Sequence, residues 1–283
     1  MQNLSIIGAG RLGTSLGRLS FLSGLVQIGS VCNRNMQHAR DAVAFIGAGS
    51  AHVPGDLPPL SGLILLAVPD DAIAVSAAQL VGFVEPGAVV CHASGVHDHS
   101  VLAPLARAGV ATGSLHPAFS FADPARAVAS FAGTLCALEG EAAALPVLSA
   151  FAAAIGGRPF ALAPGGKAAY HAALSIASNY LVTLTAEALA AAARAGIDAT
   201  LARELLGSLM RQTLDNALAL GPAAALTGPI ARGDAATVAR HLAVLDDAAA
   251  QACYRALGRA TLDLARPKLS AGTIAALTAL LAD

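Results

Sequence analysis

Short apolar runs rich in β-branched residues alternate with stretches of helical periodicity up to about residue 162. The runs predict strands at 4–7, 25–32, 63–68, 88–92, 111–115, 133–138 and 158–162. Helices are predicted between them, at 12–22, 36–45, 71–81, 99–107 and 141–155. This alternation is typical of an α/β fold in which crossover helices connect the strands of a doubly wound parallel sheet.

The pattern changes after Pro164, where alanine-rich helical sequence begins and continues almost to the end of the chain. Its glycines and prolines predict breaks at Gly196, Gly207, Gly221, Gly228, Gly233, Pro267 and Gly272. We therefore expect two domains, an α/β domain at 1–163 and an all-helical domain at 164–283.

The composition raises the question of a membrane protein, because 55% of the 283 residues are hydrophobic and only 12% are charged. A spanning helix needs about 20 consecutive apolar residues. The longest uncharged candidate, 168–186, contains His171, Ser175 and Asn179, so no run is a plain span. The first residues carry neither a basic region nor a cleavage site, and we expect a cytoplasmic protein with no membrane partner.

The net charge and the cysteine content indicate whether nucleic-acid binding, disulfides or a metal site should be expected. The formal net charge of −1 predicts no basic surface for nucleic acid. The four cysteines are far apart in the sequence and form no CxxC pair, which is typical of reduced thiols and gives no reason to expect a metal site.

A G-x-G-x-x-G motif, formed by Gly8, Gly10 and Gly13, follows the first predicted strand and begins the first predicted helix. In Rossmann-type dinucleotide sites the first glycine permits a tight turn, the second lets backbone amides approach a pyrophosphate, and the third lets the helix pack closely on the strand. The residues expected to bind the cofactor here are Gly8, Ala9, Gly10, Arg11, Leu12 and Gly13. A glycine-rich turn without a ligand is the simpler alternative.

The end of the second predicted strand indicates which dinucleotide binds. A carboxylate at this position would hold the ribose 2′-hydroxyl of NAD, but the sequence there is Cys32-Asn33-Arg34-Asn35. The planar guanidinium of Arg34 can pair with a 2′-phosphate, so we expect NADP(H), with Asn33 and Arg34 as contacts. The alternative is that Arg34 is a solvated surface residue.

Two later strand ends are expected at the same cleft, because ligands of open α/β sheets bind beyond the carboxyl ends of the strands. The backbone segments expected to line the cofactor are Ala67, Val68, Pro69 and Ala93. Ser94 then stands where the nicotinamide or the substrate would lie. His92 either belongs to the site or is a buried histidine with satisfied hydrogen bonds.

The stretch after Gly165 carries a polar stripe on an almost uncharged helix. At 100° per residue, the positions that fall within one sector of about 80° are Lys167, His171, Ser175 and Ser178, and Asn179 and Thr183 widen the stripe to about 160°. The other faces are small or apolar and suit burial. We expect the stripe to line a cleft in which a substrate satisfies its polar groups; the alternative is that these groups satisfy one another across a dimer core.

Reduction of a ketone or imine needs a group that donates a proton to the developing alkoxide or amine. His171 titrates in the right range, and Lys167 lies one helical turn earlier. Asn179 and Ser175 are expected to hold the substrate on the same face. His116, in Leu115-His116-Pro117, follows another strand end and is a further candidate for substrate contact.

Arg232 lies in a glycine-bounded loop, Gly228-Pro229-Ile230-Ala231-Arg232-Gly233-Asp234. In a chain so poor in charge, it is a candidate for binding a substrate carboxylate. The alternatives are that Asp234 caps the next helix and that Arg232 pairs only with Asp234.

Together, the motifs GAGRLG, AVPDDAI, HASG, SLHPAFSF, YHAALSIASNY and ALTGPIARGD resemble a family of NADP oxidoreductases. Its members join a Rossmann-like domain to a helical domain of the 6-phosphogluconate-dehydrogenase C-terminal type, and some are alternative ketopantoate reductases. Related β-hydroxyacid dehydrogenases have an asparagine four residues after a lysine on the corresponding helix. Here His171 stands at that spacing from Lys167, so we prefer His171 with Asn179 as the catalytic pair. The resemblance also implies a homodimer through the helical domain.

These observations predict an NADPH-dependent reductase of a small carboxylated keto or imino compound, with 2-dehydropantoate as one candidate substrate. A pyrroline-carboxylate or deazaflavin-type reductase is an alternative of similar architecture. An NADP(H)-binding regulatory protein without turnover is an alternative of another class.

Overall fold

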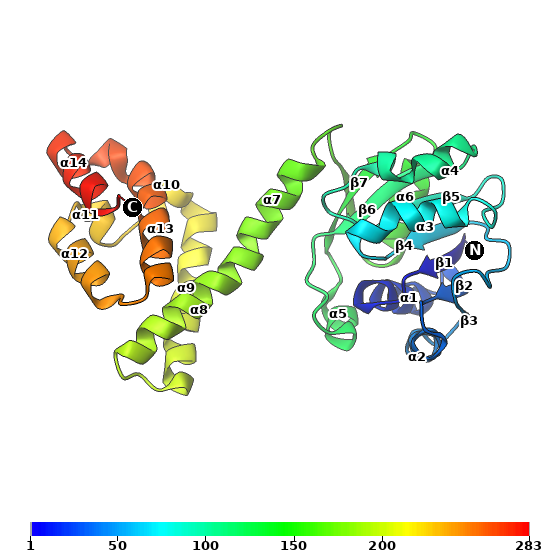
Figure 1. Ribbon diagram of the computed structural model, residues 1–283, viewed down its shortest axis with the longest axis horizontal. Helices are drawn as coiled ribbons and strands as arrows, with labels where there is room; N and C mark the ends of the chain where they lie inside the picture. The colour runs from blue at the N-terminus through cyan, green and yellow to red at the C-terminus, as the bar shows by residue number, and fades with distance from the viewer. Residues whose placement is uncertain (1, 283) are drawn as a thin grey trace. The chain divides into compact units, whose positions relative to one another are not determined.

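The computed structural model describes residues 2–282 and divides into two compact units, Met1–Ile176 and Ala177–Asp283 (Figure 1). The first contains every strand, and the second consists of helices and turns. The sequence places the start of the helical domain at residue 164, whereas the structure groups 164–176 with the sheet.

The first unit is built on an eight-stranded sheet in the order β3-β2-β1-β4-β5-β6-β7-β8. The strands are β1 (Gln2–Ile7), β2 (Val26–Cys32), β3 (Ser50–His52), β4 (Leu63–Leu66), β5 (Val89–His92), β6 (Ala111–Pro117), β7 (Leu135–Gly140) and β8 (Arg158–Ala161). All neighbours pair in parallel except β6 and β7, which are antiparallel. The predicted α/β Rossmann-like, doubly wound class is therefore confirmed, with one antiparallel pairing that the sequence pattern did not predict.

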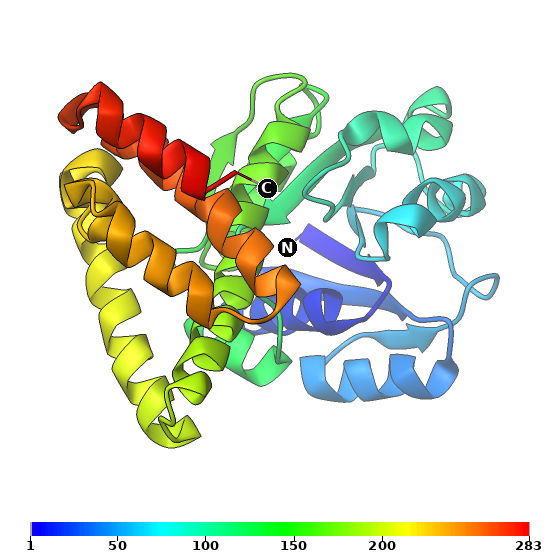
Figure 2. The same ribbon diagram turned by 60° about the vertical axis from the view of Figure 1, so that its left-hand side comes forward.

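Helices cover both faces of this sheet (Figure 2). They are α1 (Arg11–Ser23), α2 (Met36–Ile46), α3 (Ile73–Leu80), α4 (Ala103–Arg107), α5 (Pro124–Ser130) and α6 (Leu145–Ala154), with the 3₁₀ turns η1 (Asp70–Ala72) and η2 (His99–Leu102). Alternate side chains of β1 enter opposite cores, Leu4 and Ile6 on one face and Ile7 on the other. Because both faces are covered, the central strand β4 is a continuous apolar run with every residue buried.

The sequence pattern does not predict two short elements, β3 and α5. Strand β3 has only three half-exposed or exposed residues and no β-branched side chain. Helix α5 is a seven-residue element that begins with Pro124 behind the Asp123 cap. Both are too short to show a period in the sequence.

The second unit contains only helices. After α7 (Lys167–Ala177), which ends at the boundary of the two units, these are α8 (Asn179–Arg194), α9 (Ala199–Leu220), α10 (Pro222–Ala225), α11 (Pro229–Arg232), α12 (Ala235–Val244), α13 (Ala248–Ala265), η3 (Arg266–Lys268) and α14 (Ala271–Leu280). The predicted breaks at Gly207 and Gly272 are wrong, because Gly207 lies inside α9 and Gly272 inside α14. A glycine costs a helix only about 1 kcal/mol relative to alanine, which a long packed helix tolerates.

The helical stretch Lys167–Arg194 is long and apolar enough to cross a membrane by length and composition. Ser178 interrupts it between α7 and α8, and the polar stripe runs along it. One such helix is weak grounds for a membrane span. We expected its apolar faces to be buried, but the single chain leaves Ile176, Tyr180 and Val182 more than half exposed.

Candidate active site

The turn between β1 and α1 depends on glycine at two positions. Gly8 has a φ of +94°, and a Cβ there would lie 2.7 Å from the carbonyl oxygen of Ala67. A Cβ at Gly13 would lie 2.6 Å from the carbonyl oxygen of Gly8, because the helix packs directly on the turn. Gly10, by contrast, faces open space. The structure thus leaves room at the second glycine, where backbone approach to a phosphate would require it.

Hydrogen bonds from β2 hold this turn in place. The amides of Gly8 and Ala9 donate to the carbonyl of Cys32 at 2.9 and 3.1 Å. The Asn33 side-chain amide donates to the carbonyl of Ala9 at 3.1 Å. No side chain caps the N-terminus of α1 at Gly10, so the first amides of this helix are available to an anion.

A cavity of about 1080 Å³ opens beside the turn, within the first unit. The predicted cofactor residues that line it are Gly8, Gly10, Asn33, Arg34, Ala67, Val68 and Pro69. At the end of β2 the lining contains Arg34 and His38 and no carboxylate. The size and lining fit a dinucleotide, with two basic side chains where an adenosine 2′-phosphate would lie.

The other predicted cofactor residues surround this cavity without lining it. Arg11 is exposed at the start of α1, and Leu12 and Ala93 pack partly against the sheet core. Ala9 and Gly13 are buried within and behind the turn. The positions of Ala9, Gly13 and Ala93 suit a supporting role, whereas Arg11 and Leu12 carry backbone amides of the first turn of α1.

His92, at the end of β5, is a fully buried histidine with both ring nitrogens used. Nδ1 accepts the amide proton of Ser94 at 3.1 Å, and Nε2 lies 3.0 Å from the carbonyl oxygen of Asp98. Since a carbonyl can only accept, Nε2 carries the proton. Burial lowers the pKa of His92 to about 4. His92 therefore holds the loop after β5 as a neutral ring, in agreement with the alternative of a satisfied buried histidine.

The Ser94 hydroxyl is used within the same loop, where it accepts the amide protons of Val96 and His97 at 3.2 and 3.1 Å. Its carbonyl oxygen accepts a hydrogen bond from Lys167. Sequence reasoning had assigned Ser94 to the substrate; the structure shows its oxygen atoms shaping the loop and holding the lysine.

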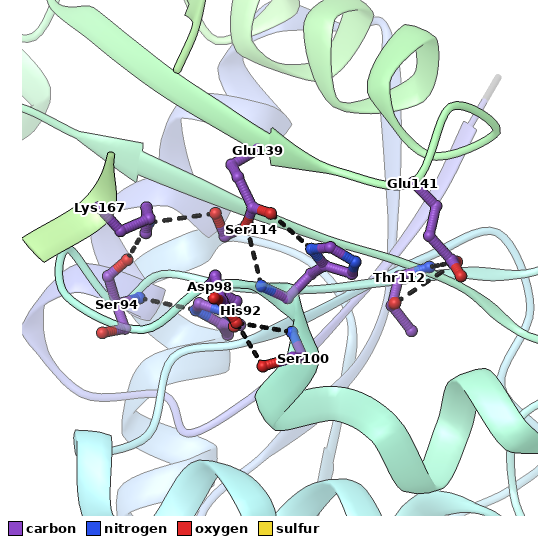
Figure 3. Close-up of polar contacts among 10 residues, drawn as sticks. His92, Ser94, Asp98, Ser100, Thr112, Ser114, Glu139, Glu141 and Lys167 are labelled. Atoms are coloured by element: carbon purple, nitrogen blue, oxygen red, sulfur yellow. Dashed lines mark hydrogen bonds and ion pairs between the residues drawn. The ribbon is translucent and has the colours of Figure 1, made fainter. Parts of the chain in front are cut away.

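Lys167 begins α7 and is buried, with only 2% of its surface exposed. Its Nζ donates to the Ser94 carbonyl oxygen at 2.6 Å and to the Ser114 hydroxyl of β6 at 3.1 Å (Figure 3). Burial lowers the pKa of Lys167 to about 8, and nearby carboxylates, Glu139 first, oppose that effect. These contacts join the start of α7 to the sheet, which is why residues after 163 group with the first unit.

Three aromatic side chains, His116, Tyr170 and His171, meet near Lys167. His116 Nδ1 lies 2.9 Å from the Tyr170 hydroxyl, and the His116 and His171 rings are 6.3 Å apart at 77°. Burial lowers the pKa of His116 to about 4 and raises the pKa of Tyr170 to about 12, so both are neutral at pH 7. A Cβ at Gly95 would collide with Cδ2 of His171 and would lie 3.0 Å from Nε2 of His116. The two imidazoles thus lie directly against the backbone of the loop after β5.

The structure brings Lys167, His171, Ser94 and His116 together at one edge of the sheet. Ser175 is half-buried on α7. Asn179 and Arg232 belong to the second unit and are exposed there. Sequence reasoning gave no role to Tyr170 or Ser114, although both stand in the motifs quoted above, because neither falls on the polar stripe.

Arg232 lines a cavity of about 240 Å³ in the second unit, together with Thr227 and Lys268. Asp234 accepts the amide proton of Thr237 at 3.0 Å and is the N-cap of α12, as one alternative proposed. Within residues 2–282, Arg232 forms no ion pair with Asp234 within 4.0 Å. No group of three or more histidine, cysteine or acidic side chains suited to a metal occurs in that range.

Two family models match parts of the chain. A Rossmann-like domain matches residues 2–117, and DUF2520, a domain of unknown function, matches residues 134–261. No curated protein matches the chain.

Solved structures of the same architecture extend over nearly the entire chain. Protein TM1727 from Thermotoga maritima is 26% identical, with a TM-score of 0.70, covering 94% of this chain and 99% of that one. BF3122 from Bacteroides fragilis, provisionally named an NADP oxidoreductase, is 22% identical, with a TM-score of 0.76 and coverages of 93% and 98%. A reductive aminase from Aspergillus terreus, in complex with NADPH and ethyl-5-oxohexanoate, is 18% identical, with a TM-score of 0.59 and coverages of 99% and 92%. At these identities the comparison establishes the fold.

Proposed function

We propose that the protein is an NADPH-dependent oxidoreductase that reduces a small carboxylated keto or imino compound. One observation carries the proposal: Lys167 meets Ser94, and His116 and His171 meet Gly95, at the carboxyl edge of the sheet that also carries the glycine turn and its cavity. Ligands of such sheets bind at this edge. The NADPH complex of the structurally similar reductive aminase supports the same class of reaction.

For the cofactor, we infer NADP(H) over NAD(H). The Gly8–Gly10 turn and the first turn of α1 would hold the pyrophosphate, and Arg34 with His38 would hold the 2′-phosphate. Bound there, NADPH supplies the hydride of the reduction. The residues of the chain must then supply a proton, orientation and charge.

In this proposal His171 donates the proton to the substrate oxygen or nitrogen. Lys167, still largely charged at neutral pH, stabilises the negative charge that develops on that atom. His116, held neutral by burial and bonded to Tyr170, positions the substrate. Ser175 would contact the substrate from α7, and the amide of Asn179 and the guanidinium of Arg232 are further candidates for substrate binding.

The reductase class is tested by NADPH oxidation against 2-dehydropantoate, pyrroline-5-carboxylate and related keto acids and cyclic imines. Turnover of one of them supports the proposal and identifies the substrate. NADPH binding, measured by its fluorescence, without turnover of any favours the regulatory alternative. A deazaflavin substrate is included to test the third possibility.

The role of His171 is tested by His171→Ala on the substrate so identified. We expect a loss of about 100-fold or more in kcat, with NADPH binding retained. The matched control is His241→Ala, because His241 lies on α12 and its ring bonds Tyr254. Full turnover by His171→Ala would refute the assignment.

We also propose a cytoplasmic homodimer formed through the helical unit. Large apolar side chains of α8 and α9 remain exposed in the single chain, with Val182 at 70% and Leu218 at 78%. Exposed apolar surface of this kind marks protein interfaces. Light scattering after gel filtration should give the mass of two chains, and Leu218→Glu should shift it toward one.

A further inference from the structure

Lys167 is an ammonium group in a buried position without a direct ionic partner. Within residues 2–282, no carboxylate lies within 4.0 Å of its Nζ, and its two hydrogen-bond acceptors, a carbonyl and a hydroxyl, are neutral. A buried charge without compensation is costly and tends to lose its proton. The fold must therefore supply negative charge at slightly longer range if the amine is to stay protonated.

Glu139 is placed to supply that charge. In the antiparallel pair of β6 and β7, Glu139 is directly opposite Ser114, whose hydroxyl binds Lys167. Side chains of directly opposite residues lie on the same face of a sheet, about 5 Å apart at Cβ. Figure 3 shows the Glu139 carboxyl group beside Ser114 and Lys167. Among the charges that act on Lys167, Glu139 has the largest effect, ahead of Asp70 and Asp98.

His99 fixes the orientation of that carboxylate. Its Nδ1 lies 2.5 Å from Oε1 of Glu139, and its backbone amide donates to Oε2 at 2.9 Å. The Glu139 side chain is 10% exposed, whereas that of His99 is 34% exposed. Both carboxylate oxygens are thus occupied by one residue, and the acid cannot turn away from the lysine without breaking both hydrogen bonds.

We propose that Glu139, held by His99, is a positioning residue that keeps the Lys167 ammonium charged at the Ser94 carbonyl and the Ser114 hydroxyl. The pair acts through Lys167 and does not touch the substrate. This inference rests on the proposed function only for its catalytic meaning, since the effect on Lys167 exists without cofactor or substrate. The titratable groups that interact electrostatically with the amine are Asp70, His92, Asp98, His116 and Glu139, while His99 contacts Glu139 and His171 interacts with His116.

The chain offers a direct measurement, because Lys167 and Lys268 are its only lysines. With carbon-13 at lysine Cε, the Lys268→Arg protein gives a single resonance whose pH titration reports the Lys167 pKa. In this background Glu139→Gln should lower that pKa by about 1 unit or more. His99→Gln should lower it by a smaller amount, because the backbone bond to the carboxylate remains. Glu139→Asp should restore part of the shift.

The matched control is Glu141→Gln. Glu141 lies just beyond the end of the same strand and accepts the amide proton of Thr112 at 2.7 Å. It is therefore a similar carboxylate that bonds elsewhere, and its replacement should leave the Lys167 titration unchanged. Equal titration in the parent and Glu139→Gln proteins would overturn the proposal. If Glu139→Gln does not fold, an unchanged titration in His99→Gln overturns it instead.

Different results would refute the reductase proposal and the proposal for Glu139. Absence of turnover on every substrate would count against the reductase and leave the Lys167 titration to be judged by itself. If turnover is found, Glu139→Gln should also move the basic limb of the kcat/KM pH profile to lower pH, with Glu139→Asp in between. A purely structural role for Glu139 would lower activity at all pH values without moving that limb.

Discussion

Replacement of His92 should remove part of the acid sensitivity of the first unit. His92 is fully buried, and both ring nitrogens are used, so the folded protein has no acceptor for a second ring proton. Its pKa falls from the ordinary value of 6.5 to about 4, mainly because burial penalises the charged ring. Between pH 6.5 and about pH 4, the unfolded chain therefore binds more protons than the folded one. The stability contributed by the neutral ring is complete above pH 6.5 and is lost as the pH falls toward 4.

The size of this loss in stability follows from the interval between the ordinary pKa of 6.5 and the lowered pKa of about 4. At about pH 5 the unfolded histidine is largely protonated while the folded one is still largely neutral, a difference of about 1.5 pKa units. At about 1.36 kcal/mol per unit, the free energy of unfolding should fall by about 2 kcal/mol from this residue alone. His116, with a pKa lowered similarly, adds to the loss in the parent protein.

The assay is urea denaturation followed by circular dichroism at about pH 7 and about pH 5, with parent, His92→Gln and His38→Gln proteins. His92→Gln should be less stable at neutral pH, because it loses ring hydrogen bonds, but its loss on acidification should be smaller than that of the parent by about 2 kcal/mol. The exposed His38 is the control, and its replacement should leave the acid-induced loss unchanged. An equal loss in the parent and His92→Gln proteins would refute the reasoning.

Three further predictions concern the site and the helical unit. Gly95→Ala places a Cβ against His171 and His116, so kcat on the identified substrate should fall at least about tenfold with NADPH affinity kept; unchanged kcat would contradict the close packing. If Arg34 binds the 2′-phosphate as proposed, Arg34→Ala should lower the preference for NADPH over NADH, measured by fluorescence titration, by about tenfold or more; an unchanged ratio would place the 2′-phosphate elsewhere. Gly207→Ala, inside α9 with ordinary contacts for a Cβ, should raise the free energy of unfolding by about 0.5–1 kcal/mol in urea denaturation; a loss of stability would show that the glycine is required.

The fold class could be predicted because its signals are local. The alternation of apolar runs and helices anticipated seven of the eight strands, and the glycine motif indicated the turn at which α1 begins. The three-residue strand β3 shows no period. The antiparallel pairing of β7 with β6 depends on both strands and cannot be predicted from the sequence of either one.

The candidate site, like the fold, could be predicted only where its signals are local in the sequence. Helical periodicity placed Lys167 and His171 on one face of α7, and the glycine spacing identified the turn, because both follow from backbone geometry over a few residues. Only the tertiary structure shows that Lys167 bonds Ser94, 73 residues earlier, and that Tyr170 bonds His116, 54 residues earlier. The sheet register likewise brings Glu139 opposite Ser114, next to the site. Burial and charge at the site depend on residues distant in sequence, and chain folding alone decides which of them meet.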